Sequence, residues 1–113
     1  MKNVRKSLTT VLERNKTFTR EVFETEPYEA AWSTEARWFV SVMETSGEDV
    51  VVKLRPQVSP DGIQWCDGEW GPITIEGNGL YSRGMNNFGS WLRLLGEVHS
   101  GSVKLMISLA LKE

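Results

Sequence analysis

The strongest constraint on the fold is the closing segment "VKLMISLALKE", residues 103 to 113. Its large apolar residues recur at every second position: Val103, Leu105, Ile107, Leu109 and Leu111. Because successive side chains of a β-strand point to opposite faces, this alternation predicts a strand with one face on a core. Other segments of the chain must supply the partners that bury that face.

Several other segments show the same period of two. "EARWFVSVMET" places Ala36, Trp38, Val40 and Val42 on one face, and "VVVKLRPQVS" alternates in the same way. Shorter candidates are "KTFTREVFE", "IQWCD", "PITIE" and "SWLRLLGEV". The intervening "SGED" predicts a turn, and Pro56 predicts a strand edge or a bulge. Strands separated by Gly, Asp-Gly and Ser-Gly turns indicate an all-β fold, an antiparallel β-sandwich of about seven to nine strands.

The first sixteen residues have a different pattern. Residues 1–20 carry six basic and one acidic side chain, a net of +5, whereas residues 21–113 carry seven basic and fourteen acidic, a net of −7. Val4, Leu8, Val11 and Leu12 fit one face of a short amphipathic helix, and the Thr-Thr-Val run fits a strand or an extended arm. We expect a basic arm, residues 1–16, followed by a β-sandwich domain, residues 17–113. An acidic neighbouring copy would bind the arm through Val4, Arg5, Leu8, Val11 and Leu12.

Composition disfavours several classes of function. A single cysteine, Cys66, excludes an internal disulfide framework and a cysteine zinc site, and a single histidine, His99, disfavours a His-rich metal site or a His-centred triad. No nucleotide-binding or hydrolase motif occurs, so we predict no enzyme, no cofactor and no metal. The acidic body disfavours specific nucleic-acid binding. No apolar run is long enough for a membrane span, and the N-terminus lacks a secretory h-region; we expect a cytoplasmic or virion location.

The stretch "QVSPDGIQWCDGEWG", residues 57 to 71, allows two interpretations. In the first, Pro60, Asp61 and Gly62 form a hairpin turn, and Trp65 covers the end of the core. In the second, aromatic and polar side chains from this stretch and the Gly-rich loop that follows form a ligand or partner surface. The residues of that surface would be Trp65, Asp67, Trp70, Tyr81, Asn87 and Phe88.

The same stretch carries family resemblances. "SPDGIQW" resembles the Asp-box of sialidases, with one residue missing between Asp61 and Gly62, and the Ser-x-Asp-Gly-x-x-Trp hairpin of discoidin-like carbohydrate-binding domains. In both groups the motif mainly shapes a turn. The chain is also similar to small β-sandwich structural proteins of tailed phages and prophages. This similarity rests on the order along the chain of four stretches: "VVVKLRPQVSPDGIQW", "GPITIEGNG", "SWLRLLGEV" and "VKLMISLALK". That similarity covers about residues 35–113 and has no counterpart for the first forty residues.

Two functions follow as hypotheses. The phage resemblance implies a jelly-roll-like sandwich that is a non-enzymatic, homo-oligomeric structural subunit, such as a capsid decoration or a tail component of a larger shell. The alternative is a small carbohydrate-binding module whose exposed aromatic platform binds a glycan.

Overall fold

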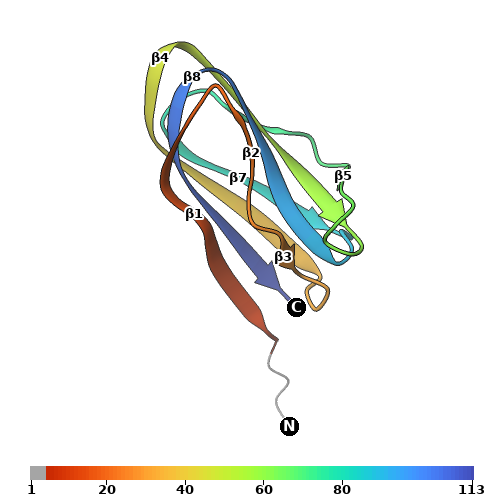
Figure 1. Ribbon diagram of the computed structural model, residues 1–113. Helices are drawn as coiled ribbons and strands as arrows, with labels where there is room; N and C mark the ends of the chain where they lie inside the picture. Colours follow the sequence, from red (N-terminus) through yellow and green to blue (C-terminus); the bar gives the residue numbers. More distant parts are fainter. Residues whose placement is uncertain (1–4) are drawn as a thin grey trace.

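The computed structural model describes residues 5–113, and all of the regular secondary structure in that range is β (Figure 1). The predicted all-β antiparallel fold is confirmed. No helix is present in these residues, so none could cross a membrane. The strands, in chain order, are β1 (Ser7–Thr19), β2 (Val22–Glu24), β3 (Tyr28–Glu29), β4 (Glu35–Ser59), β5 (Cys66–Asp67), β6 (Ile73–Ile75), β7 (Gly79–Asn86) and β8 (Trp91–Lys112).

Two long strands, β4 and β8, form the centre of the molecule. They pair antiparallel from Glu35 opposite Lys112 to Ser59 opposite Trp91. Both bend sharply near their middle, so that their halves lie in two layers (Figure 1). The first layer contains β1, β8 (102–112), β4 (35–46) and β7; the second contains β2 and β3, β8 (91–100), β4 (51–59), and β5 and β6. The sandwich is therefore one sheet folded over on itself.

The bend lies where the sequence predicted a turn between separate strands. Gly47, Asp49 and Gly101 adopt positive φ angles of 106°, 52° and 75°. A Cβ on Gly101 would lie 2.7 Å from the carbonyl oxygen of Ser46, so the close crossing of the two strands requires glycine there. The prediction of a turn at "SGED" between separate strands is wrong, because the ladder with β8 resumes after the irregularity and β4 continues as one strand.

The core consists of the alternating faces that the sequence predicted. All five apolar residues of the closing segment are buried, as are Ala36, Trp38, Val40 and Val42 of β4. Beyond the bend, Val52 and Leu54 of β4 and Leu92 and Leu94 of β8 are buried in the second layer. Pro56 lies between the stretches of β4 that pair with β6 and with β5. Its carbonyl oxygen accepts a hydrogen bond from the Gly68 N–H there. The proline, which has no N–H to donate, thus lies at an interruption of the ladder on this side of β4.

The N-terminal segment is an edge strand of the same sandwich. β1 pairs with β8 from Ser7 opposite Lys112 to Thr19 opposite Ser102, and Leu12 packs partly buried against the core. The Glu113 N–H also donates to the Lys6 carbonyl oxygen. Since this pairing satisfies backbone groups of β8 that would otherwise be unpaired, strand formation outweighs the helical pattern of the segment.

The prediction of a separate arm over residues 1–16 is thereby corrected. Residues 7–16 are strand, and the expected boundary between residues 16 and 17 falls inside β1. Of the predicted partner-binding residues, Leu8 and Val11 are 38% and 39% exposed, Arg5 is exposed, and Val4 lies outside the described residues. The contact with a neighbouring copy stays a prediction, now for an edge strand rather than for an arm.

Candidate functional site

A hollow of about 570 Å³ opens on the outer face of the first layer. Its volume falls in the range of about 300–1,000 Å³ that small-molecule sites occupy. Three strands and the segment between β5 and β6 line it, through Glu35, Ala36, Arg37, Phe39, Trp70, Gly84, Met85, Asn86, Ala110 and Lys112.

The alternation of β4 explains why Arg37 and Phe39 face outward. Because Ala36, Trp38 and Val40 are buried, Arg37 and Phe39 point to the opposite face. In the register of the sheet, Arg37 lies between Gly84 of β7 and Ala110 of β8, and Phe39 lies between two serines, Ser82 and Ser108. Large side chains on the central strand thus have small neighbours on both sides, which leaves a depression in the surface.

The guanidinium of Arg37 lies across β7. Its Nη1 donates to the Oγ of Ser82 at 3.0 Å. A Cβ on Gly84 would stand 2.6 Å from the Arg37 Nη2 and 3.2 Å from its Cζ, so the absence of a side chain at Gly84 makes room for the group. The hydrogen bond and the glycine together fix the guanidinium beside the hollow.

Trp70 reaches the hollow from the second layer. It belongs to the segment between β5 and β6, where Gly68 leaves space for its ring: a Cβ there would lie 2.1 Å from the indole. Arg83 of β7 donates from Nη2 to the carbonyl oxygen of Pro72 at 3.2 Å, which ties this segment to the edge of the first layer. The Trp70 ring, partly packed on the core, therefore closes one side of the hollow.

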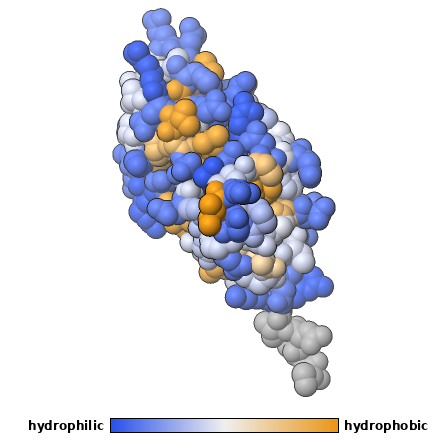
Figure 2. All heavy atoms as spheres, turned by 45° about the vertical axis from the view of Figure 1, so that its right-hand side comes forward, coloured by the Kyte–Doolittle hydropathy of each residue, from blue (hydrophilic) through white to orange (hydrophobic). Residues whose placement is uncertain are grey.

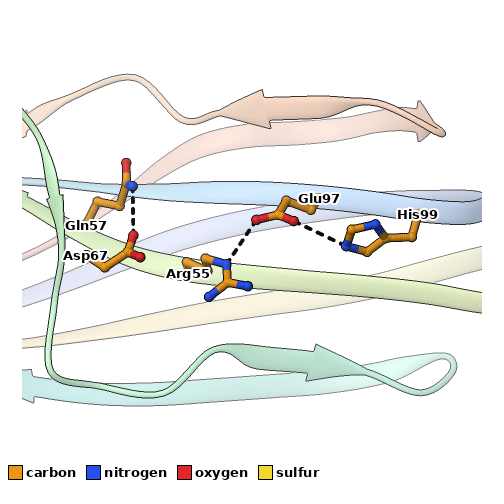
Figure 3. A network of polar contacts seen from close by, with 5 residues as sticks. All are labelled: Arg55, Gln57, Asp67, Glu97 and His99. Atoms are coloured by element: carbon orange, nitrogen blue, oxygen red, sulfur yellow. Dashed lines mark hydrogen bonds and ion pairs between the residues drawn. The ribbon is translucent and has the colours of Figure 1, made fainter.

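A second group of polar side chains crosses the outer face of the second layer (Figure 3). Arg93 Nε donates to Gln57 Oε1 at 2.8 Å, and Gln57 Nε2 donates to Asp67 Oδ1 at 2.9 Å. Arg93 also pairs with Glu24 at 3.1 Å, and its guanidinium lies 4.4 Å from the ring centroid of Trp65. This row joins β2, β8, β4 and β5, and its side chains form hydrogen bonds and ion pairs with one another.

A shorter row lies beside it. Arg55 Nε pairs with Glu97 Oε1 at 2.9 Å, and the other oxygen of Glu97 lies 3.2 Å from His99 Nε2 (Figure 3). His99 lies in β8 near the bend, and its side chain is 53% exposed. Within residues 5–113, no three His, Cys, Asp or Glu side chains gather as metal ligands would.

The "SPDGIQW" segment is a tightly bonded turn. Ser59 Oγ accepts from the Asp61 and Gly62 N–H groups at 3.2 and 2.8 Å, while Asp61 Oδ1 accepts from Ile63 at 2.9 Å and Gln64 at 3.0 Å. The N–H groups of Gln64 and then Ile63 hold the pKa of Asp61 below its ordinary value. Hydrogen bonds within the motif therefore account for its serine and aspartate, as in the hairpin interpretation.

The six residues predicted as one ligand surface are separated in the structure. Trp65 and Asp67 lie with the polar row of the second layer, whereas Trp70 lines the hollow. The Tyr81 hydroxyl donates to the Gly77 carbonyl oxygen and accepts from the Glu76 N–H, so it closes the turn between β6 and β7. Phe88 is in the core at 4% exposure, and Asn87 is an exposed residue with φ of 53°.

Sequence reasoning missed most of the hollow. Arg37 and Phe39 could be recognised as the outward face of "EARWFVSVMET", which is visible in the alternation alone. Their juxtaposition with Gly84 and Ala110 depends on the register of three strands, and the position of Trp70 depends on how a connecting segment of the second layer reaches the first. Local patterns carry neither kind of information.

Comparison with known proteins assigns no family. No protein-family model matches the chain, and no curated protein does. Among solved structures, the crystal structure of FLHE superposes with a TM-score of 0.43 at 12% sequence identity, covering 96% of this chain and 95% of that one. At that TM-score the likeness carries no argument about function.

Proposed function

We propose that this protein is a small, non-enzymatic β-sandwich binding protein that takes a carbohydrate in the hollow beside Trp70. The observation that supports this proposal is the set of lining residues. An indole and a phenyl ring share the hollow with a guanidinium, a carboxylate and a carboxamide, those of Arg37, Glu35 and Asn86.

This combination suits a sugar. The C–H face of a pyranose stacks on an aromatic ring, while its hydroxyl groups exchange hydrogen bonds with planar polar side chains. The floor of Gly84 and Ala110 lets a flat ring approach the sheet closely. The hollow is open rather than enclosed, so a sugar chain can extend beyond it on either side.

The same residues favour binding over hydrolysis. Glycosidases use two carboxyl groups, one on each side of the scissile bond. Glu35 is the one carboxylate among the residues that line the hollow. A sugar held there would meet a single acidic group, which supports a binding role without catalysis.

The self-associating structural subunit that the phage resemblance implies has less support from the geometry. β1, whose residues were expected to reach a neighbour, is paired within its own chain. Its free edge carries Arg14 and Lys16 and is interrupted by register shifts between Val11 and Lys16, features that oppose edge-to-edge pairing. On the side shown in Figure 2, apolar surface occurs as small separate areas among hydrophilic ones.

The test is a glycan array followed by calorimetry. A glycan that binds through the hollow should lose most of its affinity in Trp70→Ala, since the stacking surface is removed. Trp65→Ala is the matched control, because it removes an equal ring from the opposite layer. Circular dichroism must show both variants folded. Binding that survives Trp70→Ala, or is lost equally in Trp65→Ala, would place the site elsewhere, and an array without any binder would remove the proposal.

A further inference from the structure

The hollow carries positive charge on an acidic protein. Two cationic side chains, Arg37 and Lys112, line it together with one anionic side chain, Glu35. Residues 21–113, which include the hollow, have a net charge of −7. A local excess of positive charge on such a surface attracts anionic ligands to the hollow.

Neither cation of the hollow forms an ion pair within the described part of the chain. The ion pairs found in residues 5–113 join Arg55 to Glu97, Arg93 to Glu24 and His99 to Glu97. Glu35 stands opposite Lys112 in the ladder, yet the two side chains form no ion pair. The charge on the hollow is therefore available to a ligand.

Arg37 differs from the three other arginines of β4, β7 and β8. Arg55 and Arg93 are bonded to carboxylates, and Arg83 donates to the Pro72 carbonyl oxygen. The Arg37 guanidinium has one neutral partner, the Ser82 hydroxyl. That bond uses one of five N–H donors and leaves the planar fork fixed in position with most of its donors free, which is the arrangement that binds a carboxylate through two parallel hydrogen bonds.

We infer that the carbohydrate bound in the hollow is acidic, and that Arg37 selects it by binding the sugar carboxylate while Trp70 stacks on the ring. This inference rests on the proposed function and adds the ligand class and the residue that sets specificity. Gly84 contributes to this selection, since any side chain there would displace the guanidinium of Arg37.

The experiment compares acidic oligosaccharides with their uncharged methyl esters. The probes are tetragalacturonate, glucuronate-bearing xylotetraose and sialyllactose, each with its methyl ester, titrated calorimetrically into the full chain. At least one acid should bind about tenfold or more tightly than its ester, as expected for a hydrogen bond to a charged group. Arg37→Met should reduce this preference to less than about twofold while ester binding persists, and Arg37→Lys should retain part of it.

Two further variants isolate the geometry from the charge. Gly84→Ala keeps Arg37 but forces its guanidinium to move, so the preference for the acid should fall although the net charge is unchanged. Arg14→Met removes the same charge from β1, outside the hollow, and should leave the preference intact. Circular dichroism and denaturation of each variant exclude loss of fold as the cause.

The outcomes separate this inference from the proposed function. Suppose that acids and esters bind with equal affinity and that Trp70→Ala abolishes both. This result would support the sugar site but overturn the selection of acids. If Arg14→Met and Arg37→Met reduced the preference for acids equally, the preference would come from net charge, and the role of Arg37 would be overturned. A sulfated oligosaccharide bound through Arg37 in preference to every uronate or sialate would overturn the carboxylate as the group recognised. Absence of binding by any sugar would remove the proposed function itself.

Discussion

The rings of Phe18 and Phe23 stack across the reversal between β1 and β2, with their centroids 3.6 Å apart and their planes 12° apart. Phe18 lies opposite Val103 in the first layer, and Phe23 lies opposite Gly96 in the second. The stack therefore joins the two layers at one side of the sandwich. It also explains why a glycine occupies position 96, inside a strand that is otherwise rich in leucine.

Gly96→Ala should lower the free energy of unfolding by about 1–3 kcal/mol, the usual range for an overpacked core. A Cβ at this position would lie 2.3 Å from the Phe23 ring and 2.9 Å from Leu54 Cδ2, so the stacked ring must move. Urea denaturation followed by circular dichroism measures the change. Gly71→Ala is the control, because its Cβ would meet only Arg83 Nη1 at 3.7 Å. Equal stability of the two variants would show that position 96 tolerates a side chain.

Deletion of residues 1–16 should destabilise the protein rather than merely alter its assembly. The deletion removes most of β1 and leaves β8 paired only with β4 along residues 105–112, with its other edge open. It also uncovers the buried side chains of Leu109 and Leu111 from that side. We expect a lower denaturation midpoint and aggregation in light scattering. A deleted chain that is as stable and monodisperse as the full one would instead identify the segment as dispensable for the fold.

The contact between Trp65 and Arg93 should contribute to holding the hairpin on the sheet. A double-mutant cycle with Trp65→Leu and Arg93→Leu should give a coupling free energy of about 0.5–1 kcal/mol, as expected for a cation over an indole ring at a partly exposed site. The guanidinium lies 4.4 Å from the ring centroid. Arg55→Leu paired with Trp65→Leu is the control cycle, since Arg55 bonds to Glu97 and not to this ring. Additive effects in the first cycle would contradict the interaction.

The turn at Asp61 should weaken in acid. Its pKa is lowered from an ordinary value of 3.8, so the folded state binds the proton less tightly than the unfolded state. The stabilisation is therefore complete above the unfolded value and is lost as the pH falls through the lower folded value. Above that range, the Ile63 and Gln64 amides should exchange more slowly in the unmodified protein than in Asp61→Asn. As the pH falls through that range, hydrogen exchange in the unmodified protein should accelerate relative to Asp61→Asn. Glu48→Gln, whose carboxyl accepts no hydrogen bond found within residues 5–113, is the control and should show no such difference.

Much of the core was predictable from the sequence because the face of a strand is a local property. The alternation in residues 103–111 and 36–42 identified the buried side chains without any knowledge of their partners. The bend at Gly47 was not predictable, since positive φ serves both a hairpin turn and a bent strand, and only continued pairing with β8 distinguishes them. The apolar spacing from Val4 to Leu12 fitted a helix, but the open edge of β8 selected a strand.

The candidate site was predictable only in fragments. Trp70 was identified from its neighbours in sequence, and its proposed companions Tyr81 and Phe88 proved to serve a turn and the core. Arg37 and Gly84 are 47 positions apart and meet because β7 pairs with β4 in one particular register. Such convergence is a property of the whole sheet and leaves no trace in any short stretch of residues.

The continuous ribbon of β4 and β8 has a mechanical consequence. In a sandwich whose sheets are joined by loops, one sheet can in principle peel away while the other keeps its ladders. Here every ladder in either half is anchored to the same two backbones, which cross the fold at Gly47 and Gly101. Disturbance of one half is transmitted along these strands to the other, so the molecule should melt as a single cooperative unit, and a ligand held on one face should protect amides on both.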